Sequence, residues 1–324
     1  MRGHTLYNWA CIAMMCLVTA SCNGGGVFGE DEPSWRSQSS GTGSDLRALF
    51  FIDENTGWIV GQHGTILHTT NAGEDWEHQD SGTDRFLRSL HFDDGQTGWA
   101  VGLSGRILHT TNAGDTWQRQ QSGTNSSLRT VHFVDDQNGW VAGSDGVILN
   151  TDNGGSSWTQ QESGTGNTIR SLHFADEENG WAIAAGGIIL STSDGGENWS
   201  LQQTGTDQSL RAVYFHDESS GWVVGDRLGG EAPILRTRNG GEDWDTLESG
   251  IEGYLLSVHF VDEQTGWAVG GRSGGEAPIL FTDDGGGEWV TESGNTNRSL
   301  IGVYMLDRQT GWAVGRDGLI LHYN

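Results

Sequence analysis

Short runs of alternating apolar and polar residues recur along most of the chain, and turns rich in glycine or aspartate separate them. In one unit these runs cover residues 87–92, 98–102 and 107–110, and a fourth run begins at Trp117. Alternation with a period of two predicts half-buried β-strands, and the short turns between them predict antiparallel pairing. We therefore expect four short strands in each unit of about 41 residues.

Two series of tryptophans show how often this unit is repeated. Seven Gly-Trp pairs place Trp at positions 58, 99, 140, 181, 222, 267 and 312, in four steps of 41 residues and two of 45. A second series with the same steps has Trp at positions 35, 76, 117, 158, 199, 244 and 289. Regular repeats of four short strands are typical of β-propellers, and seven repeats predict seven blades.

The two ends of the chain complement each other. Residues 35–42 read like residues 76–83 and 117–124, which supply the fourth strand of other units, whereas the last unit stops at Asn324 before such a segment. A ring in which the first strand completes the last blade accounts for both ends. The sequence therefore predicts an all-β, seven-bladed propeller over residues 34–324, with four-stranded antiparallel blades and the N-terminal strand completing blade seven.

Residues 1–21 have the features of a signal peptide of the lipoprotein type. A basic residue near the start is followed by an apolar run at 9–18 and by small residues at 19–21, and Cys22 then occupies the position of a lipidated first residue. Residues 22–33, rich in glycine and acidic side chains, predict a flexible tether. We expect an exported protein, lipid-anchored in the bacterial cell envelope, either in the periplasm or at the cell surface; simple secretion is the alternative.

The composition is strongly acidic, with a formal net charge of -26 and 17 basic residues that are all arginine. This charge argues against nucleic-acid binding, which needs a basic surface, and against adsorption to anionic membranes. We therefore expect no nucleic-acid partner and no membrane contact except through the lipid anchor. The lack of lysine fits either a high-salt habitat or a general composition bias, and both interpretations stay open.

The turn before each tryptophan of the second series has a sharp pattern, Ser/Thr-x-Asp/Asn-x-Gly-x-x-Trp, as in residues 69–76 and 192–199. The pattern resembles the Asp-box, or bacterial neuraminidase repeat. Asn or Asp side chains bind nearby backbone amides and Gly accepts a positive φ, so we interpret the pattern as a structural turn. Asn fills the acidic position in four of six intact copies, which argues against calcium binding or catalysis there.

These turns, the Asp-x-x-x-Gly-Trp turns and the Leu-Arg-x-Val/Leu-x-Phe strands make residues 34–324 similar to the photosystem II stability/assembly factor family. The resemblance implies a seven-bladed propeller that acts as an assembly chaperone. It also implies that an arginine patch on one propeller face engages the client, which is the protein being assembled.

One register of the first strand carries arginine in five consecutive blades. We call these residues the arginine arc: Arg47, Arg88, Arg129, Arg170 and Arg211. The same register holds Leu256 and Ile301 in blades six and seven. Because the first strand is innermost in a propeller, we expect the arc at one mouth of the central channel. Clustered arginines suit a carboxylate, so the arc predicts binding of an acidic segment or peptide C-terminus.

A structural role for the arc is the alternative. An Asp follows each first strand, as Asp94 follows Arg88, but about six extended residues separate the two, on the order of 20 Å. The two side chains are therefore expected at opposite ends of the strand. Backbone carbonyls or acids of the loops between blades, such as Asp84 and Asp207, stay open as partners. The second-to-third-strand loops of blades five and six are longer by four residues and lie on the arc's face, which favours that face for binding.

Four histidines, His91, His132, His173 and His259, share another register with Phe50, Tyr214 and Tyr304. Metal binding needs ligands around one ion, and the spacing of blades around a sevenfold ring is too wide for that. We therefore expect aromatic packing between blades and no metal site.

An enzyme would need singular residues in this nearly uniform repeat. A glycoside hydrolase would use paired carboxylates, and the best candidates are Glu231 and Glu276, with Glu252 and Tyr254 nearby. A carbohydrate-binding propeller would need exposed tryptophans, whereas the repeated turns predict burial. We favour a noncatalytic, monomeric binding scaffold without a cofactor, whose client is a protein or peptide such as a membrane protein being assembled; the two carbohydrate-directed functions remain the alternatives.

Overall fold

Short antiparallel strands make up almost all regular structure in the part of the chain that this computed structural model describes, residues 33–226, 230–271 and 274–324. Residues 33–324 form one compact unit. The predicted signal peptide, Cys22 and nearly all of the predicted tether lie outside the described residues. No helix within the described ranges is long and apolar enough to cross a membrane.

Blades one to four have the same four-strand pattern. Blade one contains β2 (Leu46–Phe51), β3 (Gly57–Gly61), β4 (Ile66–Thr69) and β5 (Glu77–His78), with a short 3-10 turn η1 (Gln62–Gly64). Blade two contains β6 (Leu87–Phe92), β7 (Gly98–Gly102), β8 (Arg106–Thr110) and β9 (Gln118–Gln121). Blade three contains β10 (Leu128–Phe133), β11 (Asn138–Gly143), η2 (Ser144–Gly146), β12 (Ile148–Asp152) and β13 (Thr159–Gln161). Blade four contains β14 (Ile169–Phe174), β15 (Asn179–Ala184), β16 (Ile188–Ser193) and β17 (Ser200–Gln202).

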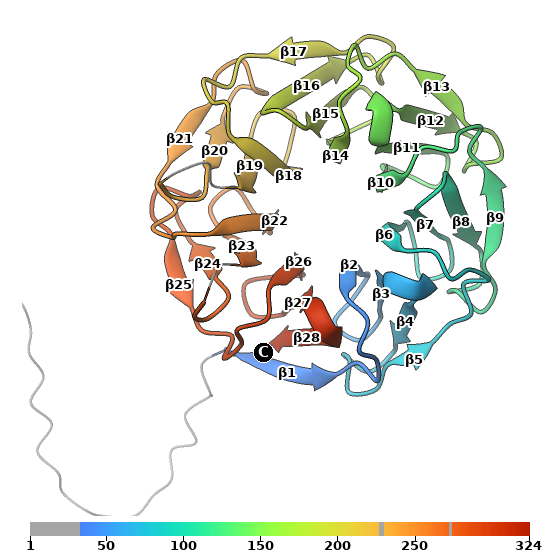
Figure 1. Ribbon diagram of the computed structural model, residues 1–324, viewed down its shortest axis with the longest axis horizontal. Coiled ribbons are helices and arrows are strands. Elements are labelled where there is room, and N and C mark those ends of the chain that lie inside the picture. Colours follow the sequence, from blue (N-terminus) through green and yellow to red (C-terminus); the bar gives the residue numbers. More distant parts are fainter. Residues whose placement is uncertain (1–32, 227–229, 272–273) are drawn as a thin grey trace, which may run out of the picture. The chain divides into compact units, whose positions relative to one another are not determined.

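Blades five to seven complete the ring of Figure 1. Blade five contains β18 (Ser209–Phe215), β19 (Gly221–Asp226), β20 (Ile234–Thr237) and β21 (Asp245–Leu247). Blade six contains β22 (Tyr254–Phe260), β23 (Gly266–Gly271), β24 (Ile279–Thr282) and β25 (Val290–Glu292). Blade seven contains β26 (Leu300–Met305), β27 (Gly311–Gly315), η3 (Arg316–Gly318), β28 (Leu319–Tyr323) and β1 (Trp35–Ser39).

Strand pairing confirms the predicted propeller. Five sheets have four strands each, and an eight-stranded sheet contains blades five and six, joined by the single residue pair Asp226 with Tyr254. Counted as two blades, the joined sheet brings the number to seven among the described residues. The innermost strands β2, β6, β10, β14, β18, β22 and β26 contact one another in a closed cycle.

The predicted closure by the N-terminal strand is also confirmed. Strand β1 pairs with β28 from Trp35 opposite Tyr323 to Ser39 opposite Leu319. The Trp35 indole Nε1 donates a hydrogen bond of 2.8 Å to Glu292 Oε2 in blade six, so the closing strand is also tied to the neighbouring blade. The first and last described elements therefore share one sheet, as Figure 1 shows.

The Gly-Trp pairs form the contact between neighbouring blades. The ring of Trp58 stacks on Phe92 of the next blade, with centroids 3.7 Å apart and planes within 13°, and five other blade junctions have an equivalent Trp-Phe stack. Glycine is required before the tryptophan, because a Cβ on Gly57 would lie 2.4 Å from the Phe51 ring of its own blade. The dipeptide therefore combines close packing within a blade with ring stacking between blades.

The turns from the third to the fourth strand are held by their own polar side chains. In blade one, the backbone amide of Gly73 donates to Thr69 Oγ1 at 2.9 Å, and the amide of Asp75 donates to Asn71 Oδ1 at 3.0 Å. Gln38 Nε2 of the preceding blade donates to the Ala72 carbonyl at 2.8 Å. The Asn or Asp of each turn is thus used to fold the turn, which is the structural role predicted for it.

Candidate functional site

The arginine arc sits on a β-bulge that recurs in the innermost strand of every blade. In β2, Leu46 pairs with Gly61 and Ala48 pairs with Val60, so Arg47 has no partner in β3. Equivalent register shifts occur in the other six innermost strands. A bulge directs the extra side chain away from the regular alternation of the strand. All five arc residues are thereby turned toward one central pocket.

The bulge was not predicted from the sequence, although a glycine signals it. A Cβ on Gly61, the last residue of β3, would lie 2.4 Å from the carbonyl oxygen of Asp45, just before the bulge. Six blades have glycine at this position, and Ala184 replaces it in blade four. The glycine permits the close approach of the two strands that the extra residue requires.

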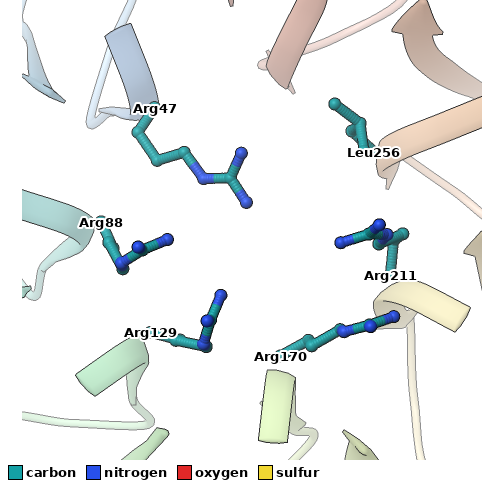
Figure 2. A pocket seen from close by; sticks show the side chains of 6 residues that line it. All are labelled: Arg47, Arg88, Arg129, Arg170, Arg211 and Leu256. Carbon is teal, nitrogen blue, oxygen red and sulfur yellow. The ribbon is translucent and has the colours of Figure 1, made fainter. Parts of the chain in front are cut away.

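The five arc side chains converge, as predicted. Together with Leu256 they line a central space of about 20 Å³, and Figure 2 shows their guanidinium groups gathered around it. This space has room for one small group of about the size of a water molecule. A further cavity of about 180 Å³ extends along the same strands, where small side chains such as Ser89, Thr130 and Ser171 line it.

Two arc residues have partners within the protein. Arg211 forms an ion pair with Asp226, in which Nε and one terminal nitrogen both donate to Oδ2. Arg170 donates to Ser209 Oγ at 2.6 Å and to the Leu210 carbonyl at 2.8 Å, both at the start of the next blade. The structural alternative therefore holds for these two arginines, through a backbone carbonyl and an acid that sequence reasoning did not single out.

The other three arc residues, Arg47, Arg88 and Arg129, have no hydrogen-bond acceptor among the described residues. The Nε atoms of Arg88 and Arg129 are buried without a partner, and the Arg88 guanidinium lies 4.8 Å from the centre of the Phe86 ring. The Asp that follows each innermost strand is not their partner, because in blade two Asp94 Oδ1 accepts the amide of Gln96 at 2.8 Å within its own turn. Three guanidiniums are therefore available to an anion.

The clustering of the arc has an electrostatic cost. Burial, followed by the neighbouring charges of Arg88, Arg129 and Arg211, lowers the pKa of Arg47 to about 10. Burial also lowers the pKa of Arg88 and of Arg129, each with a neighbouring arginine as the second cause. Arg47 stays charged at neutral pH, so the free energy of the cluster falls when an anion binds and offsets the repulsion.

A second ring of side chains crosses the same strands. Neighbouring centroids are 4.6 to 5.4 Å apart, in the closed order Phe50, His91, His132, His173, Tyr214, His259, Tyr304 and back to Phe50. This is the predicted aromatic packing between blades. Burial lowers the pKa of His132 and of His259 to about 4, so these imidazoles are neutral near neutral pH. The described residues contain no cluster of three or more His, Cys, Asp or Glu able to hold a metal.

The carboxylates considered for glycoside hydrolysis have structural contacts. Glu231 Oε2 accepts the backbone amide of Gly250 at 2.8 Å, and Glu276 Oε1 accepts the amide of Asn295 at 2.6 Å. Both acids therefore brace the loop that enters the next blade, at equivalent places in two successive blades. The tryptophans of the described residues are buried or half-buried, which does not provide the exposed rings that a carbohydrate-binding face needs.

Comparisons with known proteins agree with this architecture. A profile of the family described as photosynthesis system II assembly factor YCF48 matches residues 29–125 and 118–204, more than half of the chain. No curated protein matches the sequence. The solved structure of YCF48 bound to D1 peptide is similar, with 22% identity, a TM-score of 0.75, and coverage of 90% of this chain and 97% of that chain.

Two other solved structures show the breadth of the fold. YCF48 from Cyanidioschyzon merolae has 23% identity and a TM-score of 0.74, with 90% of this chain and 99% of that chain covered. A GH74 enzyme of Niastella koreensis has 12% identity and a TM-score of 0.73, with 88% of this chain and 53% of that chain covered. At these identities the likeness shows the β-propeller fold and leaves the function to the site.

Proposed function

Because the chain belongs to the photosynthesis system II assembly factor YCF48 family, we propose that it is a noncatalytic scaffold whose arginine arc binds an acidic or C-terminal peptide segment of a client protein. The observation that carries this proposal is the group of three charged guanidiniums, on Arg47, Arg88 and Arg129, that converge without acceptors among the described residues. A similar solved structure is of YCF48 bound to a peptide, which supports a peptide as the ligand here.

A carboxylate fits this arrangement for chemical reasons. Its two oxygens accept several N–H donors at once, and such charge-assisted bonds are about twice as strong as neutral ones. The rest of the molecule is acidic, with a net charge of -26, so the arc is a local positive focus that favours anions only at the mouth. A free peptide terminus supplies one carboxylate on a narrow chain, which suits a small central space that continues into a cavity of about 180 Å³ lined by the same arginines.

The test is a peptide-binding titration with a charge-matched control. Replacing Arg47, Arg88 and Arg129 with Gln is expected to weaken binding of a fluorescent peptide with a free C-terminus by more than about 100-fold, since hydrogen bonds to charged groups contribute about 1.5–3 kcal/mol each. The control carries the same substitution at the exposed residues Arg36, Arg119 and Arg238 and is expected to bind normally. Equal binding by both triple variants would refute the proposal.

The enzyme alternative has its own test. Because Glu231 and Glu276 accept loop amides, we propose that they do not form a catalytic pair. A screen of purified protein against glycan and aryl-glycoside substrates is expected to show no hydrolysis. Turnover that is lost in both Glu231→Gln and Glu276→Gln would establish a glycosidase instead.

We also propose that the protein is exported and anchored in the cell envelope through a lipid on Cys22. The support is the signal-like sequence of residues 1–21, with Cys22 directly after the small residues 19–21. Labelling with a fatty-acid analogue in a bacterial host is expected to mark the full-length protein and not the Cys22→Ser variant. Labelling of that variant, or label-free export of the full-length protein, would contradict the anchor.

A further inference from the structure

A larger cavity opens beside the arginine arc on the side of blade six. It has a volume of about 500 Å³, and its lining includes Tyr254, Leu256 and Arg316. We call it the blade-six pocket. Three residues, Arg47, Arg211 and Leu256, line both this pocket and the central space of the arc. A ligand that places an anionic group among the arginines can therefore extend from the central space into the blade-six pocket.

Blade six differs from the other blades where it lines this pocket. Leu256 occupies the register that holds arginine in the first five blades. At the register of Tyr254, the other blades have Asp45, Phe86, Ser127, Thr168, Ser209 and Ser299. An isobutyl group and a phenol ring thus stand together only at blade six, next to five cations. These apolar surfaces contribute favourably to binding only when a ligand group covers them and removes them from water.

The wall formed by Tyr254 is held in place from two sides. Its backbone pairs with that of Asp226 in β19. Within residues 33–226, 230–271 and 274–324, this is the one pairing of strands that joins two blades. Its hydroxyl lies 2.9 Å from Ser299 Oγ of blade seven. Asp226 also binds Arg211, so the arc and the apolar wall are connected through one residue. A fixed wall of this kind favours binding because less side-chain freedom is lost.

Two of the three free cations lie across the mouth from Leu256, and the third, Arg47, lines the blade-six pocket with it. Arg88 and Arg129 face Leu256 across the pocket in Figure 2, whereas Arg170 and Arg211, on the side of Leu256, already have partners. In a peptide, the last side chain branches from the carbon that carries the terminal carboxylate. A carboxylate bound by the free arginines therefore leaves its own side chain close to Leu256 and Tyr254.

We propose that the blade-six pocket selects clients whose C-terminal residue is apolar, with Leu256 and Tyr254 contacting that last side chain while Arg47, Arg88 and Arg129 bind its carboxylate. This inference rests on the proposed function, and it adds the class of terminal residue that the site accepts.

The experiment uses fluorescence anisotropy with three labelled peptides that share all residues but the last. One ends in Leu, one ends in Ser, and one ends in Leu amide. The native protein is expected to bind the Leu peptide about tenfold more tightly than the Ser peptide, which corresponds to burial of part of one apolar side chain. The amide is expected to bind at least about tenfold more weakly than the acid, because it lacks the charge that the arginines bind.

Three variants locate the effect. Leu256→Ser is expected to reduce the preference for Leu over Ser to near one, and Leu256→Arg, which copies the residue of five other blades, is expected to do the same in a fold that accepts arginine there. The control is Leu201→Ser on the outer strand β17, where the side chain is 60% exposed; it is expected to keep the tenfold preference.

The outcomes separate the two proposals. Equal affinity of the native protein for the Leu and Ser peptides, with the amide still weak, would overturn the apolar selection and leave the carboxylate site intact. Equal affinity for the acid and the amide would show that the arc does not bind a terminal carboxylate, which overturns that part of the proposed function and this inference with it. A preference for Leu that survives both Leu256 variants would also overturn the assignment of this pocket.

Discussion

Blades one to five and blades six and seven have the same bulge in their innermost strands, yet they place different side chains on it. The first five carry the arginine arc, whereas blade six carries Leu256 and blade seven carries Ile301, which is only 9% exposed. All seven blades keep the same strand pairing around the bulge. The fold therefore accepts a cation or an apolar group at this register, and the arginines are not needed to form a blade.

A second difference lies within the arc. Arg170 and Arg211 have acceptors inside the protein, and Arg47, Arg88 and Arg129 have none among the described residues. If the arginines served only to join blades, each would be expected to have the same partner in every copy of the repeat. Blades one to three therefore form the part of the mouth where the arginines lack an acceptor among the described residues.

The largest effect is expected when the arginines of blades one to three are replaced by leucine, the residue that blade six has at this register. The variant with Leu at positions 47, 88 and 129 removes three half-buried cations, two of which have buried Nε atoms without a partner. We expect its free energy of unfolding to rise by about 1–3 kcal/mol at low salt, since unsatisfied buried polar groups cost about that much. Chemical denaturation would measure the change, and a loss of stability would show that the arginines are structural.

Ligand binding is expected to stabilise the folded protein, because an anion would offset the repulsion among Arg47, Arg88 and Arg129. A peptide with a free C-terminus, present at about ten times its Kd, is expected to raise the free energy of unfolding by about 1.4 kcal/mol. The triple Leu variant should show no such increase, because it lacks the arginines that we propose as the carboxylate site. Thermal unfolding with and without peptide measures this effect, and equal stabilisation of both proteins would place the ligand elsewhere.

A smaller effect is expected when a bound arginine is made free. In Asp226→Asn, Arg211 loses its ion-pair partner and becomes similar to Arg47. We expect stability to fall by about 1 kcal/mol or less, because the pair is partly exposed, and affinity for a carboxylate to increase. Unfolding and peptide titrations on the same sample would show both changes. Lower affinity would mean that Asp226 itself orients the ligand.

The effect that is smallest at neutral pH concerns the aromatic ring, where four blades carry histidine and the others carry Phe50, Tyr214 or Tyr304. Burial lowers the pKa of His132 from 6.5 to about 4, so the unfolded chain takes up this proton at a higher pH than the folded protein. Stability is therefore lost as the pH falls from about 6.5 toward about 4. His132→Phe, which copies blade one, should reduce this loss and change little at neutral pH. A pH series of melting curves would detect it, and an unchanged slope would contradict it.

The fold was predictable because every blade repeats the same pattern of strands and tryptophans. The alternation in residues 87–92 marks an innermost strand, and the two tryptophan series count the blades without any tertiary information. Closure followed from the segment that begins at Trp35 and has no counterpart after Asn324. Local propensity and long-range pairing agree throughout, which is why pattern alone was sufficient.

The site was predictable only in part. Register placed the five arginines together, because residues equivalent in a repeat lie around one axis. Their division into free and partnered residues was not predicted, since the Arg211–Asp226 pair joins residues that are not equivalent from blade to blade. The pocket at blade six depends on Tyr254, for which the sequence predicts only a place near candidate carboxylates. Such contacts depend on departures from the repeat, and sequence periodicity contains no information on how these pack.

The pairing of β1 with β28 also sets the order in which the protein can be completed. Residues 35–39 leave the ribosome long before their strand partner, residues 319–323. Closing such a long loop is slow, and native contacts at the seam form only after residues 319–323 have been made. Until then six blades stack with two uncovered faces, and a chain that is truncated before residue 319 can never cover them.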